Sequence, residues 1–255
     1  MTLKYDSKIS ENEKYDLIAK AYLSYFADPV YDEVKQIKFE NYEVLECKNH
    51  SNAIVTSNWN YEIKNFEDVK KYNAKFLVNF TERKYNNQKL DNFRFKGSYK
   101  FMSLNLEGYE KLDIQEIENA QFEKLTDRKD LDDFVKIVGD VFSEEGSDNK
   151  KFYGIFDEYN ELSELFIIKY NQKIVGTGHL INFENKLTIV DDITMSEEVR
   201  GKGLATFLMK SLINRCIEMG QKEICLIASE DAFNIYKKLG FEEEGFWLEQ
   251  FKLNS

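Results

Sequence analysis

The chain has 255 residues, of which 42% are hydrophobic and 15% are aromatic. This apolar content is enough for a packed core, which excludes an intrinsically disordered protein, and the length suits two modules. The formal net charge of −11 disfavours a nucleic-acid partner, because an acidic surface repels phosphates. The sequence has no run of about 18 apolar residues, and its first residues lack the apolar core of a signal peptide, so neither a membrane span nor export is predicted.

Cysteine and histidine usage predicts no disulfide and no metal site. Cys47, Cys216 and Cys225 are odd in number and scattered, without C-x-x-C spacing. Without an export signal, reduced thiols in a cytoplasmic protein are expected. No set of His, Cys and carboxylate residues has the spacing of metal ligands.

Charge and glycine both change near residue 110. Residues 1–112 carry 18 Lys+Arg and 17 Asp+Glu, whereas residues 113–255 carry 17 and 29. Ten of the 12 glycines lie after residue 113. We therefore predict two domains, residues 1–110 and residues 111–255. A negative surface on the second domain suits a cationic ligand, because it steers amines inward.

The first domain has a mixed α/β pattern. Its apolar periodicity predicts a helix over 13–26, strands over 42–47 and 53–56 joined by a hairpin at 49–52, a short helix over 66–72, and strands over 75–81 and 99–106. His50 lies in the hairpin and is expected to be solvated. No catalytic or phosphate-binding pattern occurs in this half, so its role is unknown.

The second domain alternates strands and helices. The pattern predicts a strand over 114–118, a helix over 131–142 with Phe134, Ile137, Val138 and Val141 inward, a helix over 152–160, a hairpin of strands 163–170 and 173–182 across Asn171-Gln172, a strand over 187–195, a helix from about 204 to 219, a strand over 223–228, a helix capped by Ser229, and final strands over 241–253.

The segment Val199-Arg200-Gly201-Lys202-Gly203-Leu204-Ala205 lies between a predicted strand and a predicted helix. Two glycines allow the backbone to approach a ligand closely, and the two basic residues add charge where a helix N-terminus already favours an anion. The segment therefore predicts a phosphate or pyrophosphate site. A Rossmann fingerprint fails because Thr206 takes the place of its third glycine, and a P-loop fails because Leu204 follows Gly203.

Two motifs in order resemble those of one family. Arg200, Gly203 and Ala205 match the pattern Arg/Gln-x-x-Gly-x-Gly/Ala, which resembles the acetyl-CoA pyrophosphate loop of the GNAT superfamily of N-acetyltransferases. About 30 residues later, the segment 232–241 with Tyr236 resembles the second GNAT signature. The resemblance is strong over 187–246, weaker over 113–186 and absent before that. An asparagine common in the family is replaced here by Ser229.

The resemblance implies a fold and a cofactor. The fold class is α/β (α+β), with a mixed, largely antiparallel central sheet flanked by helices. The first domain is then either unrelated or a degenerate GNAT-like copy, and the sequence does not decide between them. Acetyl-CoA is the implied co-substrate. Its implied contacts are the main-chain groups of Ile193, Thr194 and Met195, the loop residues Arg200, Gly201, Lys202, Gly203, Leu204 and Ala205, and the side chain of Ser229.

Three residues are candidates for catalysis. Asp191 and Asp192 interrupt an apolar strand, where a carboxylate is costly unless it is paired or hydrated. Adjacent strand residues face opposite ways, so one of the two is expected to face a given cleft and to accept the amine proton or bind an ammonium group. Acidic residues at the corresponding place in polyamine acetyltransferases favour Asp191. The resemblance makes Tyr236 the general acid, although an aromatic on this helix could equally fill the core. His179 in a strand is expected to be structural.

These observations predict an acetyl-CoA-dependent N-acetyltransferase. The acetyl group passes to the primary amine of a small cationic acceptor by direct attack in a ternary complex, without a metal, a nucleic acid or a membrane. Two alternatives stay open: a non-catalytic acyl-CoA-binding sensor or interaction module, and a peptide or protein N-acetyltransferase.

Overall fold

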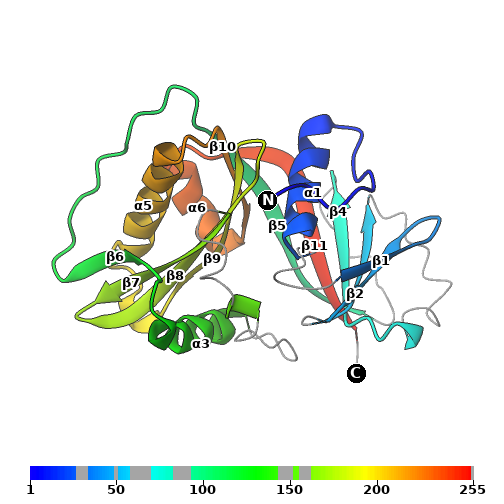
Figure 1. Ribbon diagram of the computed structural model, residues 1–255, viewed down its shortest axis with the longest axis horizontal. Coiled ribbons are helices and arrows are strands. Elements are labelled where there is room, and N and C mark those ends of the chain that lie inside the picture. Colours follow the sequence, from blue (N-terminus) through cyan, green and yellow to red (C-terminus); the bar gives the residue numbers. More distant parts are fainter. Residues whose placement is uncertain are drawn as a thin grey trace. The chain divides into compact units, whose positions relative to one another are not determined.

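The computed structural model of the protein describes residues 1–26, 34–48, 51–57, 70–82, 93–142, 152–154 and 162–253 (Figure 1). Its helices are α1 (Glu13–Phe26), α3 (Leu131–Phe142), α5 (Leu204–Glu218) and α6 (Glu230–Lys238), with short 3₁₀ helices at Arg128–Asp130 and Glu197–Val199. Its strands are β1 (Val34–Lys38), β2 (Glu43–Cys47), β3 (Ala53–Ser57), β4 (Phe76–Thr81), β5 (Phe93–Asn105), β6 (Ala120–Lys124), β7 (Ser163–Tyr170), β8 (Lys173–Asn182), β9 (Leu187–Met195), β10 (Glu223–Ala228) and β11 (Glu242–Leu253). None of the described helices is long and apolar enough to cross a membrane.

The chain divides into two compact units. Unit 1 comprises Met1–Thr2, Ser103–Leu226 and Lys238–Gly240, and unit 2 comprises Leu3–Met102, Ile227–Lys237 and Phe241–Ser255. β5, β10 and α6 contribute residues to both units. Both units are made of segments that are separate in the sequence. They therefore do not test the domain boundary expected near residue 110, which stays a prediction.

Unit 1 is built on the strand order β10-β9-β8-β7-β6. β6 to β9 pair antiparallel in succession, whereas β10 runs parallel to β9 (Figure 1). The turn between β7 and β8 is the predicted one, because Asn171 and Gln172 have φ values of 50° and 65°. Positive φ at both central residues matches the right-handed twist of a two-residue hairpin.

Residues 178 and 179 of β8 show which helix covers which face of this sheet. A Cβ atom added to Gly178 would lie 3.0 Å from Leu212 and 3.3 Å from Leu208, both on α5. His179 faces the other way, since successive strand residues alternate. Its ring contacts Tyr153 edge to face, with 6.1 Å between centroids, and Tyr153 in turn contacts Phe134 of α3. The sheet therefore carries α5 on one face and α3 on the other.

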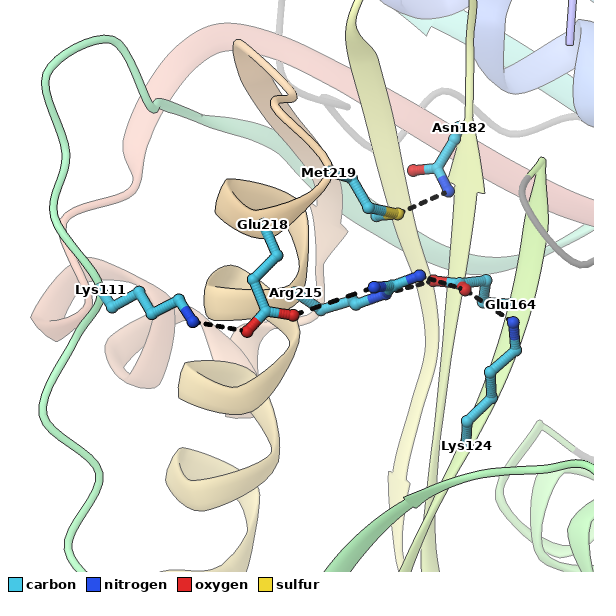
Figure 2. Close-up of polar contacts among 7 residues, drawn as sticks. All are labelled: Lys111, Lys124, Glu164, Asn182, Arg215, Glu218 and Met219. Carbon is cyan, nitrogen blue, oxygen red and sulfur yellow. Dashed lines mark hydrogen bonds and ion pairs between the residues drawn. The ribbon is translucent and has the colours of Figure 1, made fainter.

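A buried carboxylate ties α5 to the sheet (Figure 2). Glu164 of β7 is fully buried and accepts hydrogen bonds from Arg215 Nε at 2.9 Å, from Arg215 Nη2 at 2.7 Å and from Lys124 Nζ of β6 at 2.7 Å. Burial acts to raise the pKa of Glu164, but the bonds from Arg215 and Lys124 outweigh it and hold that pKa below its ordinary value. Near the end of α5, Asn182 Nδ2 also donates to Met219 Sδ at 3.7 Å. These contacts fix the helix that begins at the glycine loop.

Unit 2 has the strand order β1-β2-β3-β4-β11-β5, with β3 and β4 parallel and the ladders β1–β2, β2–β3 and β4–β11 antiparallel. Rings of Tyr15, Phe80 and Phe101 surround Phe246 at centroid distances between 5.1 and 6.1 Å. A second cluster contains Val44, Ile54, Leu77 and Phe251. The predicted helix over 13–26 and the predicted strands near 42–47, 53–56 and 75–81 are confirmed.

Three sequence predictions for the fold are wrong. Residues 114–118 form no strand; the strand β6 begins at Ala120, after Asn119 turns the chain with a φ of 63°. Val141 is 42% exposed, because the inward face of α3 ends at Val138. The segment 241–253 contains one long strand, β11 (Glu242–Leu253), instead of several. The predictions for His50, for 66–69 and for 155–160 lie outside the described residues.

Candidate active site

A β-bulge interrupts β9 at Asp192. Thr177 of β8 pairs with Thr194 of β9, and His179 of β8 pairs with Asp191 of β9. The two pairs are two residues apart on β8 but three residues apart on β9, so β9 has one extra residue between them. The extra residue is accommodated by Asp192, whose φ of 53° is left-handed, a conformation that Asp tolerates better than most residues. Thr177 Oγ1 donates to the carbonyl oxygen of Asp192 at 2.7 Å and holds the bulged backbone.

β9 and β10 pair over only part of their length. Their parallel ladder joins Leu187–Ile189 to Glu223–Cys225 and does not reach Ile193, Thr194 or Met195, although both strands are described throughout. On its other edge β9 remains paired, since Thr194 and Met195 face β8. On the edge of β9 that faces β10, the main-chain groups of these three residues are therefore not paired with β10. An edge of this kind can bind a ligand through backbone N–H and C=O groups.

The carboxylate of Asp192 is buried among polar side chains. Asp192 is 6% exposed, and its Oδ2 accepts a hydrogen bond from the Tyr153 hydroxyl at 2.8 Å. The same Oδ2 lies 3.3 Å from His179 Nδ1. The other ring nitrogen of His179, Nε2, lies 2.7 Å from Ser163 Oγ. Four side chains thus form one connected chain, Ser163–His179–Asp192–Tyr153.

Burial moves the pKa values of the acid and the imidazole in opposite directions. It raises the pKa of Asp192 from 3.8 to about 6, while the hydrogen bond from Tyr153 acts to lower it. It lowers the pKa of His179 from 6.5 to about 4, against the charge of Asp191, which acts to raise it. Both shifts have the same origin, because a low-dielectric site disfavours the charged form of any group. His179 is therefore a neutral imidazole at neutral pH.

Asp191 is half-buried and lies beside Asp192, whose N–H donates to Asp191 Oδ1 at 3.0 Å. The prediction that adjacent carboxylates face opposite ways is wrong here. Asp191 pairs with His179 across the ladder and acts on it electrostatically, while Asp192 contacts the same ring. The bulge suspends strand alternation, so both carboxylates face His179.

The glycine loop opens α5. Gly201 and Gly203 have φ values of 78° and 80°, which is left-handed backbone that favours glycine. A Cβ atom at Gly201 would meet nothing within 4 Å, and one at Gly203 would meet only Ile117 Cδ1, at 3.7 Å. Arg200 is exposed, and Lys202 is exposed with its ammonium 5.5 Å from the Tyr170 ring.

This geometry fits a pyrophosphate. α5 has 15 residues, and its N-cap Gly203 has no side chain that could satisfy the first N–H groups of the helix. Those groups and the helix dipole favour an anion, the open space at both glycines admits one, and the two basic residues add charge. Among the described residues, no group of three or more His, Cys, Asp or Glu is arranged to hold a metal ion.

Comparison with known proteins assigns part of the chain to a family. A sequence profile described as the acetyltransferase (GNAT) family matches residues 115–241. A solved structure of a GCN5-related N-acetyltransferase from Kribbella flavida matches with a TM-score of 0.68 and 12% identity, over 96% of this chain and 97% of that one. Residues 115–241 are a GNAT acetyltransferase domain. No curated protein matches the chain in sequence.

Other solved structures share the fold. A GCN5-related N-acetyltransferase from Sphaerobacter thermophilus has a TM-score of 0.60 and 14% identity over 83% of this chain and 76% of that one. A functionally unknown conserved protein from Staphylococcus epidermidis has a TM-score of 0.59 and 15% identity over 90% and 98%. The predicted GNAT-like fold, with a mixed and largely antiparallel sheet flanked by helices, is confirmed.

The remaining predicted GNAT residues lie in unit 2. Ser229 precedes α6, and its Oγ accepts from the Ala232 N–H at 3.4 Å, so it caps the helix as predicted. Tyr236 is buried on α6, with its ring centroid 5.8 Å from that of Phe241. The roles of Ser229 in cofactor binding and of Tyr236 as general acid stay predictions.

Sequence reasoning missed three members of the site. It gave no role to Tyr153 or Ser163, and it treated His179 as structural. One signal for His179 was available. The tight turn in which the Phe183 N–H donates to the Leu187 carbonyl sets the register of β8 and β9. Counting outward from that turn places His179 opposite Asp191, so a hairpin register would have joined the histidine to the carboxylates.

Proposed function

We propose that the protein is an acetyl-CoA-dependent N-acetyltransferase that moves an acetyl group to the primary amine of a small cationic acceptor by direct attack in a ternary complex. The observation that carries this proposal is the uncapped N-terminus of α5 behind two left-handed glycines, within a GNAT domain. The GNAT family uses acetyl-CoA, and this site has the shape and charge for its pyrophosphate.

Acetyl-CoA is held mainly through backbone. The N–H groups at the start of α5 bind the pyrophosphate, and the side chains of Arg200 and Lys202 add positive charge. The family resemblance adds the hydroxyl of Ser229 as a further contact to the cofactor. The segment Ile193–Met195, outside the ladder to β10, supplies main-chain donors to the pantetheine and the thioester carbonyl. Donors fixed in a strand stabilise the developing oxyanion without reorganising.

Asp191 and Asp192 handle the acceptor. The acceptor arrives as an ammonium ion, attracted by the half-buried Asp191 and by the acidic second half of the chain. Asp192 accepts the ammonium proton, because a carboxylate with a pKa near 6 is ionised at neutral pH and is a better base than an ordinary aspartate. The sequence resemblance favours Asp191 as base; the burial and hydrogen bonds of Asp192 favour assigning the base role to it instead.

The neutral amine then attacks the thioester carbonyl. A C–N bond forms, the positively charged nitrogen of the tetrahedral intermediate loses its second proton to water, the oxyanion collapses, and the C–S bond breaks to release the CoA thiolate. Tyr236 protonates this thiolate and regains its proton from solvent. Positioning of the two substrates supplies much of the rate, since effective molarities in oriented complexes are large.

The test is turnover of acetyl-CoA with a panel of small amines, following free CoA. The expected result is acceptor-dependent release that Asp192→Asn reduces at least about 100-fold while acetyl-CoA binding persists. Release with peptides but not with small amines would favour the peptide or protein acetyltransferase. Cofactor binding measured by calorimetry, with no release above hydrolysis for any acceptor, would favour the non-catalytic sensor.

A further inference from the structure

The connected chain around Asp192 has no formal positive charge. Tyr153 comes from the described segment 152–154, His179 from β8 and Ser163 from β7, and all three are buried. The carboxylate of Asp192 meets the Tyr153 hydroxyl at 2.8 Å and His179 Nδ1 at 3.3 Å. An ionised carboxylate accepts hydrogen bonds only, so both neighbours must act as donors to it.

Hydrogen bonding selects one tautomer of His179. A neutral imidazole has one N–H and one acceptor nitrogen. When Nδ1–H donates to the ionised Asp192, Nε2 must accept, and the Ser163 hydroxyl, 2.7 Å away, is able to donate to it. All four groups are then satisfied in a single arrangement. Because burial keeps the imidazole neutral, His179 acts on the carboxylate as a fixed dipole and not as a counter-ion.

We propose that Tyr153 and His179 are positioning residues that orient the Asp192 carboxylate and keep it available as an ionised base at a buried position where the two described hydrogen-bond donors are neutral. The role of Asp192 as a base rests on the proposed function. The effect of the two donors on the ionisation of its carboxylate does not. A purely structural role would require only that the polar groups be satisfied. A positioning role additionally requires that the ionisation of Asp192 depend on each donor.

The surroundings of Asp192 make this dependence measurable. Within the described part of the chain, Tyr153 and His179 contact its carboxylate, and the neighbouring Asp191 accepts from its main-chain N–H. From α3 the nearby contact is the apolar ring of Phe134, which meets Tyr153 at a centroid distance of 5.2 Å. On the opposite face, α5 presents leucines to Gly178. Removal of one donor therefore changes the hydrogen bonding of the carboxylate while the apolar surroundings are kept.

Tyr153→Phe is the first variant, because it keeps the ring and its aromatic contacts and removes only the hydroxyl donor. The second is a matched pair at His179. In His179→Asn the side-chain amide nitrogen takes the place of Nδ1 and still donates to Asp192, whereas in His179→Gln it takes the place of Nε2 and does not. Both lose the ring, so the difference between them isolates the donor.

The readout is the pKa of Asp192, measured in two ways. One is the acidic limb of kcat/KM with acetyl-CoA and an amine acceptor. The other is the carboxyl ¹³C shift of the ¹³C-labelled protein, assigned with Asp192→Asn, which requires no turnover. We expect Tyr153→Phe and His179→Gln to raise both values by about one pH unit, the usual effect of losing one hydrogen bond to a carboxylate, and His179→Asn to stay near the parent.

The outcomes separate the two proposals. An unmoved ¹³C titration in both Tyr153→Phe and His179→Gln overturns the positioning role, even if these variants are less stable. Equal shifts in the Asn and Gln variants also overturn it, because loss of the ring would then be the cause. A shifted ¹³C titration in a protein that turns over no amine supports the donors' effect and contradicts the proposed function.

Discussion

Asp192→Asn should make the protein more stable at neutral pH while removing its proposed activity. Burial raises the pKa of Asp192 from 3.8 to about 6. The stability linked to this raised pKa is fully present below about pH 4 and is lost as the pH rises through about 6. At about 1.4 kcal/mol for each pKa unit, keeping the buried carboxylate ionised at pH 7 costs about 3 kcal/mol.

The amide avoids this cost and can keep both hydrogen bonds of the acid. Its oxygen, in the place of Oδ2, still accepts from the Tyr153 hydroxyl and from His179 Nδ1–H. The hydrogen-bonded chain through His179 to Ser163 therefore survives the substitution. Only the ionisable group is lost.

Urea unfolding of the parent and the variant between pH 4 and pH 8 measures the effect. The gain in free energy of unfolding should be close to zero near pH 4 and reach about 3 kcal/mol above pH 6. The matched control is Asp191→Asn, on the adjacent half-buried residue, and its gain should remain well below that of Asp192→Asn. A gain that is the same at pH 4 and pH 7 would show that burial does not raise the pKa of Asp192, and the assignment of this residue as base would lose its physical support.

Three other perturbations have defined outcomes. Gly203→Asp should weaken acetyl-CoA binding more than about tenfold in calorimetry, because a carboxylate would face the pyrophosphate. Gly220→Asp, at another left-handed glycine with open space around it beyond the other end of α5, should leave binding unchanged. Tyr236→Phe should slow the chemical step in single-turnover measurements by at least about 100-fold if its hydroxyl protonates the thiolate, and a change within about twofold would make it a core residue only. Glu164→Gln should lower the free energy of unfolding by about 2 kcal/mol, since its two cationic partners lose their buried carboxylate. Glu218→Gln, in the exposed pairs nearby, should cost less than about 1 kcal/mol. Equal losses would mean that burial adds nothing to the ion pairs of Glu164.

Local patterns predicted those parts of the fold that local chemistry determines. The polar pair Asn171-Gln172 between two strand patterns predicted the β7–β8 turn, and the glycine loop predicted the start of α5. The strand β6 was placed too early, because the β-branched Ile114 and Ile117 favour a strand, and a single asparagine, Asn119, is a weak sign of the turn that precedes the real strand. Edges of elements depend on such single backbone conformations.

The sequence predicted the glycine loop of the candidate site, but only some of the side chains that form the rest of the site. Asp191 and Asp192 were identified because carboxylates in an apolar strand demand an explanation. The bulge that turns both toward His179 left no mark in the sequence, since Asp adopts left-handed and extended backbone alike. Tyr153 lies 39 positions before Asp192, outside any strand, and its contact follows from tertiary structure alone.

The consecutive strands β7, β8 and β9 have a consequence for folding. The hydrogen-bonded groups from Tyr153 to Asp192 all lie within one stretch of chain whose strands pair with their immediate neighbours. The helix α5, which follows the glycine loop, belongs to the crossover that brings β10 parallel to β9, a connection that closes a longer loop. Pairings of low sequence separation cost less chain entropy and form faster. The part of the site around Asp192 is therefore a local unit of the chain. It can fold before α5 completes the anion-binding part of the site.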